Sequence, residues 1–593
     1  MRLLTVLCLC LALPVAAQQA ADAVAPEAGG AAAQATSTQV AEAQRRKAAG
    51  IPVEAGEWMI VAAHPLAAEA GARMLREGGT AADALVAVQL VLGLVEPQSS
   101  GLGGGAFLVW WDAASGALTT LDGRETAPLM ASPRMFQTKD GAPMAFMDAV
   151  PGGLSVGTPG TPALLHAAHR RWGRLAWAPL FDDAIRLAED GFDVSERMAA
   201  SIAGKATALA MFPDTAAYFL PGGAPLPAGA RLRNPAYADT LRAFAAEGPD
   251  VFYTGRIGRA IVAAVQGARV NPGLLSEVDL AIYRVRERPA ICAPYRGHKI
   301  CGMGPPSSGA LTVGQTLGLL SGFDLGALGP MDAEARRLIG DAARLAFADR
   351  GRYMADSDYV PMPTRGLLDL GYLAGRADLL RGDDALPEVA PGRPEFDHAA
   401  AEWSADGTVE LPSTSHISIV DRYGNALSMT TTIESGFGSR LMVGGFLLNN
   451  ELTDFSFRSH EDGVPVANRV EPGKRPRSSM APTIVMRDGS PVLLIGSPGG
   501  SRIIGYVTNA LIAILDWGMN VQQAAMMPHM INRWGAYDLE AGTAAEALAE
   551  PLRTLGYEVK LQEMTSGLHA VALRDGLLFG GADPRREGVA LGE

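Results

Sequence analysis

The run Thr414-Ser415-His416-Ile417-Ser418-Ile419-Val420-Asp421 opens a segment in which polar and apolar residues alternate as far as Thr432. Such alternation is typical of β-strands, and Tyr423-Gly424-Asn425 in the middle of the segment supplies a turn. Residues 376–411, just before it, are dominated by Asp, Pro, Gly and Glu, a composition that predicts a mobile, exposed linker over about 376–413. The sequence therefore predicts a β-hairpin that begins with a threonine at the end of a linker.

A threonine at this position can act as a nucleophile if the chain is cut immediately before it. A threonine hydroxyl is a weak nucleophile without an adjacent base, and the α-amine freed at Thr414 would lie in the same residue. The reference pKa of an α-amine, about 7.7 to 8.0, suits a general base near neutral pH. Because any threonine that opens a strand would look the same, this pattern alone only nominates Thr414.

The composition is that of an ordinary globular protein. Of the 593 residues, 48% are hydrophobic and 19% are charged, and this length suits roughly two to four domains. The formal net charge is −13, and no long run of basic residues occurs. Because nucleic-acid binding depends on clustered Lys and Arg, this charge argues against a nucleic-acid partner.

The N-terminus has the build of a cleavable secretory signal. Arg2 precedes an apolar run over residues 3–15, and small residues follow as far as Ala17, so we predict a signal peptide over residues 1–17. The alternative, a membrane anchor, needs a longer apolar stretch. Residues 18–50 are rich in Ala and Gln and predict a flexible leader with little fold content. The mature chain is expected in the periplasm or secreted, soluble and without a membrane span.

Outward from the hairpin, the chain predicts a mixture of helices and strands. In the front part we expect helices over 66–75 and 81–95, an apolar strand over 106–111 and a mainly helical region over 160–290. In the back part we expect strands over 482–487 and 491–496 and a helix over about 503–517. Periodicity alone supports an α+β or α/β fold, with a long front part and a compact back part over 414–593.

Only two cysteines remain after removal of the signal, Cys292 and Cys301. They flank a turn-like stretch between two apolar pieces, so a disulfide across a hairpin and a pair of small buried thiols both fit the pattern. Their spacing and the lack of partner Cys or His pairs argue against a zinc site.

Several ordered motifs extend the pattern at Thr414 into a resemblance to a known family. In the back half, besides the run from Thr414, they are Thr430-Thr-Thr-Ile-Glu434, Leu447-Leu-Asn-Asn-Glu-Leu-Thr-Asp-Phe455, Lys474-Arg-Pro-Arg-Ser-Ser-Met-Ala-Pro-Thr483 and Gly496-Ser-Pro-Gly-Gly-Ser-Arg502. In the front half they are Gly101-Leu-Gly-Gly-Gly105, Asp122-Gly-Arg-Glu-Thr-Ala-Pro128, Gly157-Thr-Pro-Gly-Thr161 and Pro305-Pro-Ser-Ser-Gly309. From about residue 55 onward the chain resembles the γ-glutamyltransferases (γ-glutamyltranspeptidases or glutathione hydrolases) of the N-terminal-nucleophile hydrolase superfamily.

The resemblance implies a fold, a maturation step and an activity. The fold is an α+β, four-layer α-β-β-α sandwich, built jointly by a large subunit (51–413) and a small catalytic subunit (414–593). Autocatalytic cleavage between Ser413 and Thr414 would make these subunits from one precursor, and they would form a heterodimer. The activity is γ-glutamyl transfer from, and hydrolysis of, glutathione and other γ-glutamyl amides, with amino acids or dipeptides as acceptors. No metal or organic cofactor is expected.

The resemblance also assigns catalytic roles by position. Thr414 corresponds to the nucleophile, and Thr432 to a threonine that hydrogen-bonds the nucleophile and tunes it. Gly499 and Gly500 correspond to a glycine pair whose backbone N–H groups form the oxyanion hole. The assignment makes physical sense, because residues without side chains let two backbone donors approach a developing oxyanion closely.

The substrate-binding residues follow from the resemblance in the same way. Arg124 matches the residue that clamps the donor's α-carboxylate together with the hydroxyls of Ser478 and Ser479, and a guanidinium suits a carboxylate because it can form two parallel hydrogen bonds. The α-ammonium group is assigned to three acidic residues, Glu434, Glu451 and Asp454. Glu434 and Glu451 stand where family members vary among Asn, Gln and Glu.

The chain departs from the family pattern in one place. Several members carry a tyrosine, in a loop after the Asp-Phe motif, that covers the bound donor. Residues 456–477 contain no tyrosine and include a strongly polar stretch. We therefore expect a more open site that tolerates bulkier donors or acceptors.

Other interpretations fit the sequence less well. Gly153-Leu154-Ser155-Val156-Gly157 matches a serine-esterase motif, but no strand precedes it and no helix follows it immediately. His166 and His169 lie three residues apart on a predicted helix, without further metal ligands nearby in sequence. A glutaryl-type β-lactam (cephalosporin) acylase of the same fold would not need the acidic set. A periplasmic binding protein that never matures would not need a nucleophile or an oxyanion hole.

Overall fold

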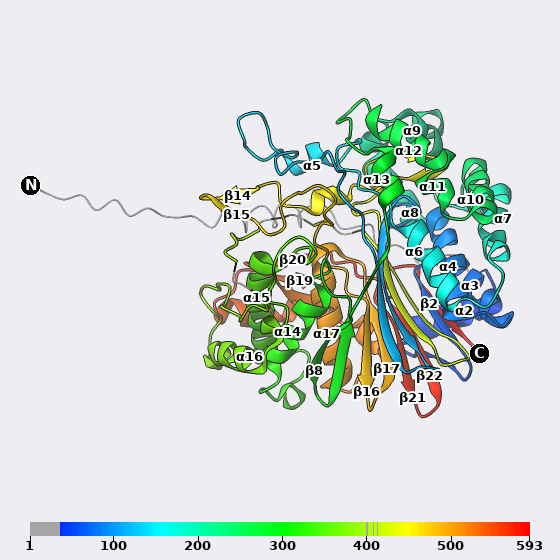
Figure 1. The fold of residues 1–593 in the computed structure, drawn as a ribbon. Helices are drawn as coiled ribbons and strands as arrows, with labels where there is room; N and C mark the ends of the chain where they lie inside the picture. The colour runs from blue at the N-terminus through cyan, green and yellow to red at the C-terminus, as the bar shows by residue number, and fades with distance from the viewer. Residues whose placement is uncertain (1–35, 399–400, 407, 409, 412) are drawn as a thin grey trace, which may run out of the picture.

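The computed structural model describes residues 36–593 except 399–400, 407, 409 and 412. Two seven-stranded sheets lie face to face, and helices cover the outer face of each (Figure 1). The first sheet has the order β1 (Val53–Ala55), β22 (Leu577–Ala582), β21 (His569–Arg574), β17 (Ser490–Gly496), β16 (Thr483–Arg487), β9 (His298–Gly302) and β8 (Ile291–Tyr295). The second has the order β23 (Val589–Gly592), β2 (Met59–Ala62), β10 (Ser415–Val420), β11 (Ala426–Thr432), β3 (Gly105–Asp112), β4 (Ala117–Gly123) and β7 (Arg286–Arg288). Both sheets combine strands from the front and back parts, so the two parts form one folded body.

The hairpin that the sequence predicts after Thr414 is present at the centre of the second sheet. Strands β10 and β11 pair in antiparallel register along their whole length. Asp421 closes the turn, because its carboxylate accepts hydrogen bonds from the backbone N–H groups of Tyr423 and Asn425, both at 3.0 Å. Gly424 has a φ of +83°, which a residue without a side chain adopts at no steric cost.

Helices form the outer layers of the sandwich. The first sheet is covered by α14 (Gly309–Leu320), α15 (Ala333–Tyr353), α17 (Ile503–Leu515) and α18 (Val521–Met526). The second sheet is covered by α3 (Pro65–Arg76), α4 (Ala81–Val95) and α6 (Thr161–Trp172), with α7 (Asp182–Asp190) and α10 (Pro235–Glu247) farther out. Between the sheets, Val61 and Val109 of the second pack in one apolar cluster with Ile484, Leu494 and Val571 of the first. The predicted four-layer α-β-β-α sandwich is confirmed.

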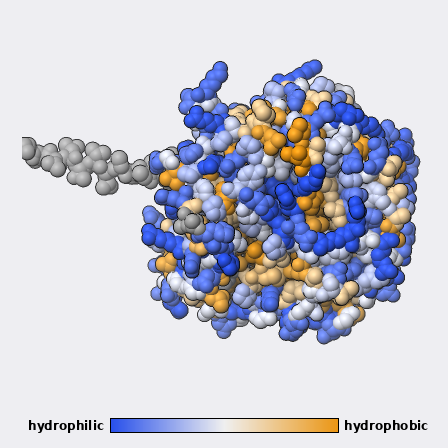
Figure 2. All heavy atoms as spheres, in the orientation of Figure 1, coloured by the Kyte–Doolittle hydropathy of each residue, from blue (hydrophilic) through white to orange (hydrophobic). Residues whose placement is uncertain are grey.

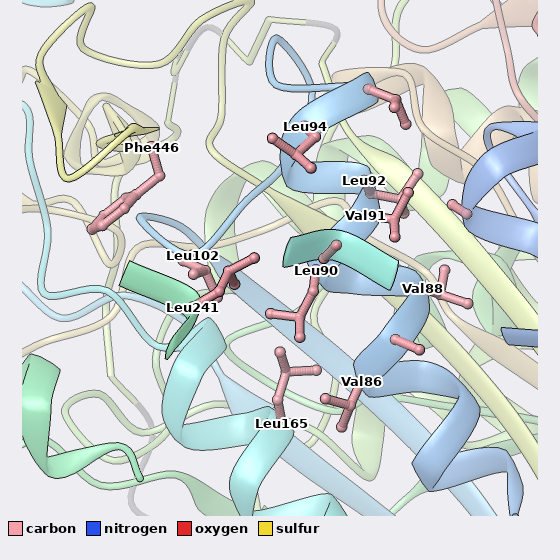
Figure 3. Packing of buried hydrophobic residues seen from close by; sticks show 14 of the residues in the cluster. Val86, Val88, Leu90, Val91, Leu92, Leu94, Leu102, Leu165, Leu241 and Phe446 are labelled. Carbon is pink, nitrogen blue, oxygen red and sulfur yellow. The ribbon is translucent and has the colours of Figure 1, made fainter. Parts of the chain in front are cut away.

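Helix α4 shows how tightly the outer layer is packed. It begins at the predicted residue, with Thr80 and Asp83 forming a reciprocal capping box. All its residues are buried, and its side chains pack toward Leu165 of α6, Leu241 of α10 and Phe446 (Figure 3). A helix that is apolar all round must be covered on every side, and here a sheet and further helices supply the cover.

Smaller elements complete the body. The predicted helical region also contains α8 (Glu196–Leu209), α9 (Pro213–Phe219), α11 (Asp250–Tyr253), α12 (Arg256–Gln266) and α13 (Glu277–Ile282). A third sheet combines β18 (Met530–Asn532), β19 (Tyr537–Glu540) and β20 (Val559–Gln562), next to α19 (Ala549–Thr554). The predicted strands at 482–487 and 491–496 and the helix after 503 correspond to β16, β17 and α17.

The leader prediction is wrong over its second half. Residues Thr38–Ala48 form helix α2, on which Val40 and Ala43 are buried. The ammonium group of Lys47 donates to the backbone carbonyls of Arg586 at 2.9 Å and Gly588 at 2.7 Å, near the end of the chain. The Ala-rich composition does not predict this helix, because only a few of its residues make the contacts that hold it against the rest of the protein. The predicted signal peptide lies outside the described residues.

The prediction of a mobile, exposed linker over 376–413 is wrong at its C-terminal end. Leu411 and Ser413 are buried, and so is the side chain of Glu410. Glu410 forms a buried ion pair with Arg350 of helix α15. An acidic residue that the sequence suggests is solvated is thus neutralised inside the protein.

Cys292 and Cys301 form a disulfide. They lie directly opposite each other on β8 and β9, at the edge of the first sheet. The hairpin alternative is therefore the correct one of the two that the sequence left open.

Hydrophilic residues dominate the face of the molecule seen in Figure 2, with hydrophobic residues in smaller patches between them. Over the described part of the chain, no helix is both long and apolar enough to cross a bilayer.

Candidate active site

The hairpin at the centre of the second sheet places two threonines side by side. Ser415 lies opposite Thr431 in the β10–β11 register, so the next pair outward brings Thr414 next to Thr432. Both residues are buried, and Thr414 is only 3% exposed. The residues for which the sequence predicts nucleophile and helper roles are thus neighbours at one end of the hairpin.

The hydroxyl groups of these threonines meet on the carbonyl oxygen of Ser413. Thr414 Oγ1 donates to this oxygen, and Thr432 Oγ1 donates to it at 2.9 Å. Thr432 Oγ1 also accepts a hydrogen bond of 2.8 Å from the backbone N–H of Glu434, which directs its own proton toward the carbonyl. The sequence predicts a contact between Thr432 and the Thr414 hydroxyl, whereas in the uncut chain both hydroxyls bind the carbonyl. A nucleophile beside a polarised carbonyl is suited to attack on the Ser413–Thr414 peptide bond.

A pocket beside Thr414 brings together every predicted site residue except Gly499. Its lining includes Arg124, Thr414, Thr432, Glu434, Glu451, Asp454, Ser478, Ser479 and Gly500, with Glu410, Leu411, Ser413, Met480 and Ile503. These residues come from both halves of the sequence, so the two halves build the site jointly.

Arg124 follows strand β4 and is completely enclosed. Its guanidinium pairs with the carboxylates of Glu451 and Asp454 and donates to the backbone carbonyls of Pro476 at 3.2 Å and Arg477 at 3.0 Å. Burial alone would lower the pKa of this guanidinium, but the two carboxylates raise it above its usual value. In the uncut chain Arg124 is therefore neutralised by two of the residues predicted to bind the ammonium group.

Carboxyl groups outnumber guanidinium groups around Arg124. Burial, reinforced by the carboxylate of Asp454, raises the pKa of Glu434 well above its usual value. Burial also raises the pKa of Glu125, and it does so to about 8 despite the adjacent Arg124. One carboxyl oxygen of Asp454, Oδ1, has no hydrogen-bond partner among the described residues. A buried acidic group with unused acceptor capacity is suited to receive an ammonium group.

The two glycines lie between β17 and α17. Gly499 has a φ of +138°, and a Cβ there would lie 2.6 Å from the ring of Tyr506. Gly500 has a φ of +56°, and its Cβ would lie 2.7 Å from the backbone carbonyl oxygen of Leu411. Side chains are excluded at both positions, and Gly500 approaches the backbone that leads to the Ser413–Thr414 bond. This geometry is compatible with backbone donors beside the reacting carbonyl.

The two serines of the predicted carboxylate clamp are held in different ways, Ser478 by the front-half motif around Ser308 and Ser479 by charged side chains. The backbone N–H and the hydroxyl of Ser308 both donate to the carbonyl of Ser478, at 2.8 Å and 2.7 Å. The Ser479 hydroxyl donates to the carboxylate of Glu410 and accepts a 2.7 Å hydrogen bond from Arg350. Ser479 therefore contacts Arg350, whereas the ion pairs of Arg124 are with Glu451 and Asp454.

Sequence reasoning missed Arg350 and Glu410. Burial alone would raise the pKa of Glu410, but the guanidinium groups of Arg350 and Arg477 lower it below its usual value. The available sequence signal was an acidic residue four positions before Thr414, inside a stretch that otherwise suggests a solvated linker.

The segment after the Asp-Phe motif does not line the pocket. Residues 456–477 contain the short hairpin β14 (His460–Glu461) and β15 (Val464–Pro465), which projects from the body near α5 (Phe146–Ala149) (Figure 1). None of them lines the pocket, whereas residues on the N-terminal side of Thr414 do. A more open site in the cut enzyme stays a prediction.

The competing motifs have structural roles. Ser155 is buried, and its hydroxyl donates to the backbone carbonyl of Val150 at 2.7 Å. His169 contacts the carbonyl of Leu175 at 2.9 Å, and His166 packs edge-on against Trp177. In the described ranges, no group of three or more His, Cys, Asp or Glu side chains is arranged to hold a metal ion.

A family model described as Gamma-glutamyltranspeptidase matches residues 67–593. The chain belongs to this family. The glutathione hydrolase proenzyme of Bacillus subtilis (strain 168) is 36% identical over 550 residues, which cover 90% of this chain and 91% of the relative. The acylase ACY 1 proenzyme of Pseudomonas sp. (strain SE83) is 34% identical over 548 residues, covering 91% and 94%.

The fold also matches a solved structure. The cephalosporin acylase from Bacillus halodurans superposes with a TM-score of 0.80, covering 91% of this chain and 97% of that one, at 24% sequence identity. At this identity the likeness concerns the fold alone.

Proposed function

We propose that the chain is a γ-glutamyltransferase and glutathione hydrolase that activates itself by cutting the Ser413–Thr414 bond. The observation that carries the proposal is the contact of two threonine hydroxyls with the carbonyl of that bond. Family membership and the resemblance to glutathione hydrolase proenzymes support it further. The products would be a large subunit over 51–413 and a small subunit over 414–593, which stay together because both sheets contain strands of each.

The chemistry is acyl transfer in both events. In maturation, Thr414 Oγ1 attacks the Ser413 carbonyl carbon, its proton passes to the Thr414 nitrogen, and the C–N bond breaks, which frees the α-amine and leaves an ester. Water then hydrolyses this ester to the Ser413 carboxylate and the Thr414 hydroxyl. In turnover, this amine accepts the Oγ1 proton and passes it to the leaving amine, while Thr414 becomes γ-glutamylated. Water, or the amine of an amino acid or dipeptide, then releases the glutamyl group. Thr432 and the backbone N–H groups of Gly499 and Gly500 stabilise the oxyanions.

The donor's zwitterionic head accounts for the charges in the pocket. Arg124, Ser478 and Ser479 are the proposed carboxylate-binding residues, and Glu434, Glu451 and Asp454 the ammonium-binding ones. A glutaryl donor has no ammonium group, so it would leave the unused Oδ1 of Asp454 without a hydrogen-bond donor. The pocket therefore favours γ-glutamyl donors over the glutaryl donors of a β-lactam acylase. Export by a signal over residues 1–17 is part of the same proposal.

The intact mass of the purified protein after overnight incubation tests maturation. We expect two fragments, the smaller beginning at Thr414, and an uncut chain for Thr414→Ala. A wild-type chain that stays whole would refute self-processing and leave a binding protein as the next interpretation. Thr414→Ser is the matched control, because it keeps a hydroxyl at the same position.

Rates with γ-glutamyl-p-nitroanilide and glutaryl-p-nitroanilide test the donor. The two compounds differ only in the α-ammonium group. We expect a kcat/KM at least tenfold higher for the γ-glutamyl compound, and the opposite preference would establish the acylase alternative.

A further inference from the structure

A second buried guanidinium lies behind the pocket, on helix α15. Arg350 is 2% exposed, and its Nε donates to the Ser308 hydroxyl at 2.8 Å, which fixes the plane of the group. Its Nη2 donates to the Ser479 hydroxyl and to a carboxylate oxygen of Glu410. The other carboxylate oxygen of Glu410 accepts from Ser479. Arg350 and Ser479 thus hold one carboxylate between them, as a built anion site would.

The carboxylate in this site belongs to the chain's own precursor segment. Glu410 lies four residues before Thr414 and lines the same pocket. Arg477, whose guanidinium is 3.8 Å from Glu410, is itself paired at 2.8 Å with Asp406 of that segment. Both acidic partners precede the proposed cut, whereas Ser479 and Arg477 follow it. The precursor segment therefore supplies the negative charge that this part of the pocket requires.

Arg124 and Arg350 differ in the origin of their partners. The carboxylates on Arg124 come from Glu451 and Asp454, which stay in the small subunit after the cut. The carboxylate on Arg350 comes from the segment that the cut releases from Thr414. A buried guanidinium that loses its partner is strongly destabilising unless another anion replaces it.

We propose that Arg350, with the hydroxyl groups of Ser479 and Ser308, forms a carboxylate subsite of the donor pocket, which Glu410 fills until the chain is cut. In the mature enzyme the subsite takes the donor's carboxylate, so Arg350 is a specificity-determining residue in addition to Arg124. Ser479, already assigned to the donor carboxylate, connects the two, because a carboxylate bound to its hydroxyl lies within reach of Arg350. The inference rests on the proposed function, since it concerns the donor of that reaction.

The first experiment needs neither cutting nor turnover. In a Thr414→Ala background, Glu410→Ala empties the subsite, and acetate should refill it. At constant ionic strength, replacing chloride by acetate should raise the Tm of T414A/E410A by several degrees. T414A alone and T414A/E410A/R350M should not respond. Equal Tm values in acetate and chloride for T414A/E410A would overturn the proposal, and so would an acetate effect that persists in T414A/E410A/R350M.

The second experiment uses the mature enzyme and two donors. γ-Glutamyl-p-nitroanilide carries the α-carboxylate, and 4-aminobutyryl-p-nitroanilide lacks it but keeps the amine. Arg350→Met should raise KM for the first donor at least tenfold and change KM for the second less than twofold, and Arg350→Lys should lie between wild type and R350M. Equal changes for both donors would refute a carboxylate-binding role. A wild-type enzyme inactive on both would instead refute the proposed function, and if R350M stays uncut the acetate experiment decides.

Discussion

Thr432→Val removes one hydroxyl from the centre of the proposed cutting site and keeps almost the same side-chain shape. That hydroxyl lies 2.9 Å from the Ser413 carbonyl oxygen and 2.8 Å from the backbone nitrogen of Glu434. Because the N–H of Glu434 occupies a lone pair of the hydroxyl, its proton points to the carbonyl. When Thr414 attacks, negative charge develops on this oxygen, and the Thr432 hydroxyl is a donor already in place.

Loss of the Thr432 hydroxyl should have two separate effects, one on the rate of cutting and one on folding stability. Loss of one preorganised donor to a developing oxyanion lowers a rate by about 10²–10³, or roughly 2.7–4 kcal/mol. Loss of the same hydroxyl also leaves a buried N–H and a buried C=O each short of a partner, which costs about 1–3 kcal/mol of folding stability. We therefore expect T432V to fold, to be less stable than the wild type, and to cut itself at least a hundredfold more slowly.

The cutting rate is measured from the intact mass of samples taken over time after purification. Unfolding of T414A and T414A/T432V gives the stability effect without interference from cutting. Thr432→Ser keeps the hydroxyl and should cut nearly as fast as the wild type. Thr431→Val is the matched control from the same strand, because the Thr431 hydroxyl is buried and makes no hydrogen bond within the described residues.

The decisive comparison is between the two valine variants. If T432V and T431V both cut within threefold of the wild type, Thr432 does not polarise the Ser413 carbonyl. Equal slowing of both variants would point to a general effect on folding, and the assigned role of Thr432 would again be wrong.

Three further predictions concern stability. Replacing Cys292 and Cys301 by serine should cost roughly 2–3 kcal/mol, the chain-entropy value for a loop this short, and reductant should lower the Tm of the wild type but not of the variant. Because Glu434 has a raised pKa when folded, it holds a proton that the unfolded chain has released, so the stability of T414A should fall as pH rises above about 4.5. In T414A/E434Q the unfolding free energy should fall less between pH 5 and pH 8. Identical pH slopes for the two variants would refute the assignment. Deleting residues 1–50 should lower Tm relative to deleting residues 1–35, because only the longer deletion removes helix α2; equal Tm values would show that α2 contributes nothing.

The fold could be predicted largely because local signals and global packing agree. The alternation after Thr414 and the capping residues around Thr80 each specify one element, and both elements form where expected. The pairing of strands across the two halves could not be read from periodicity, because a strand pattern does not name its neighbour in the sheet. The joint sandwich of the two halves was instead predicted from the ordered motifs and the family they indicate.

The ion pairs within the site could not be predicted from the sequence. Arg124 and Asp454 could be assigned to one substrate, but nothing in the sequence indicates that they pair with each other in the uncut chain. Glu410 resembles any acidic residue in a solvated linker until its contact with Arg350 is known. A long-range ion pair leaves no periodic signature, since each partner is an isolated polar residue in an otherwise ordinary segment.

The two kinds of charge occupy different parts of the pocket, and their arrangement bears on the choice of donor. Arg350 and Ser479 hold a carboxylate in the uncut chain, and Asp454 keeps an unused acceptor beside Arg124. A γ-glutamyl head can bind at both places, since it carries a carboxylate for Arg350 and Ser479 and an ammonium group for Asp454 on one carbon. A glutaryl head could replace Glu410 on Arg350, but it would bring no donor to the unused Oδ1 of Asp454 or to its buried acidic neighbour Glu434. Leaving a buried acceptor without a hydrogen-bond partner is costly, so the same pocket that accepts a carboxylate selects for the donor that also brings an amine.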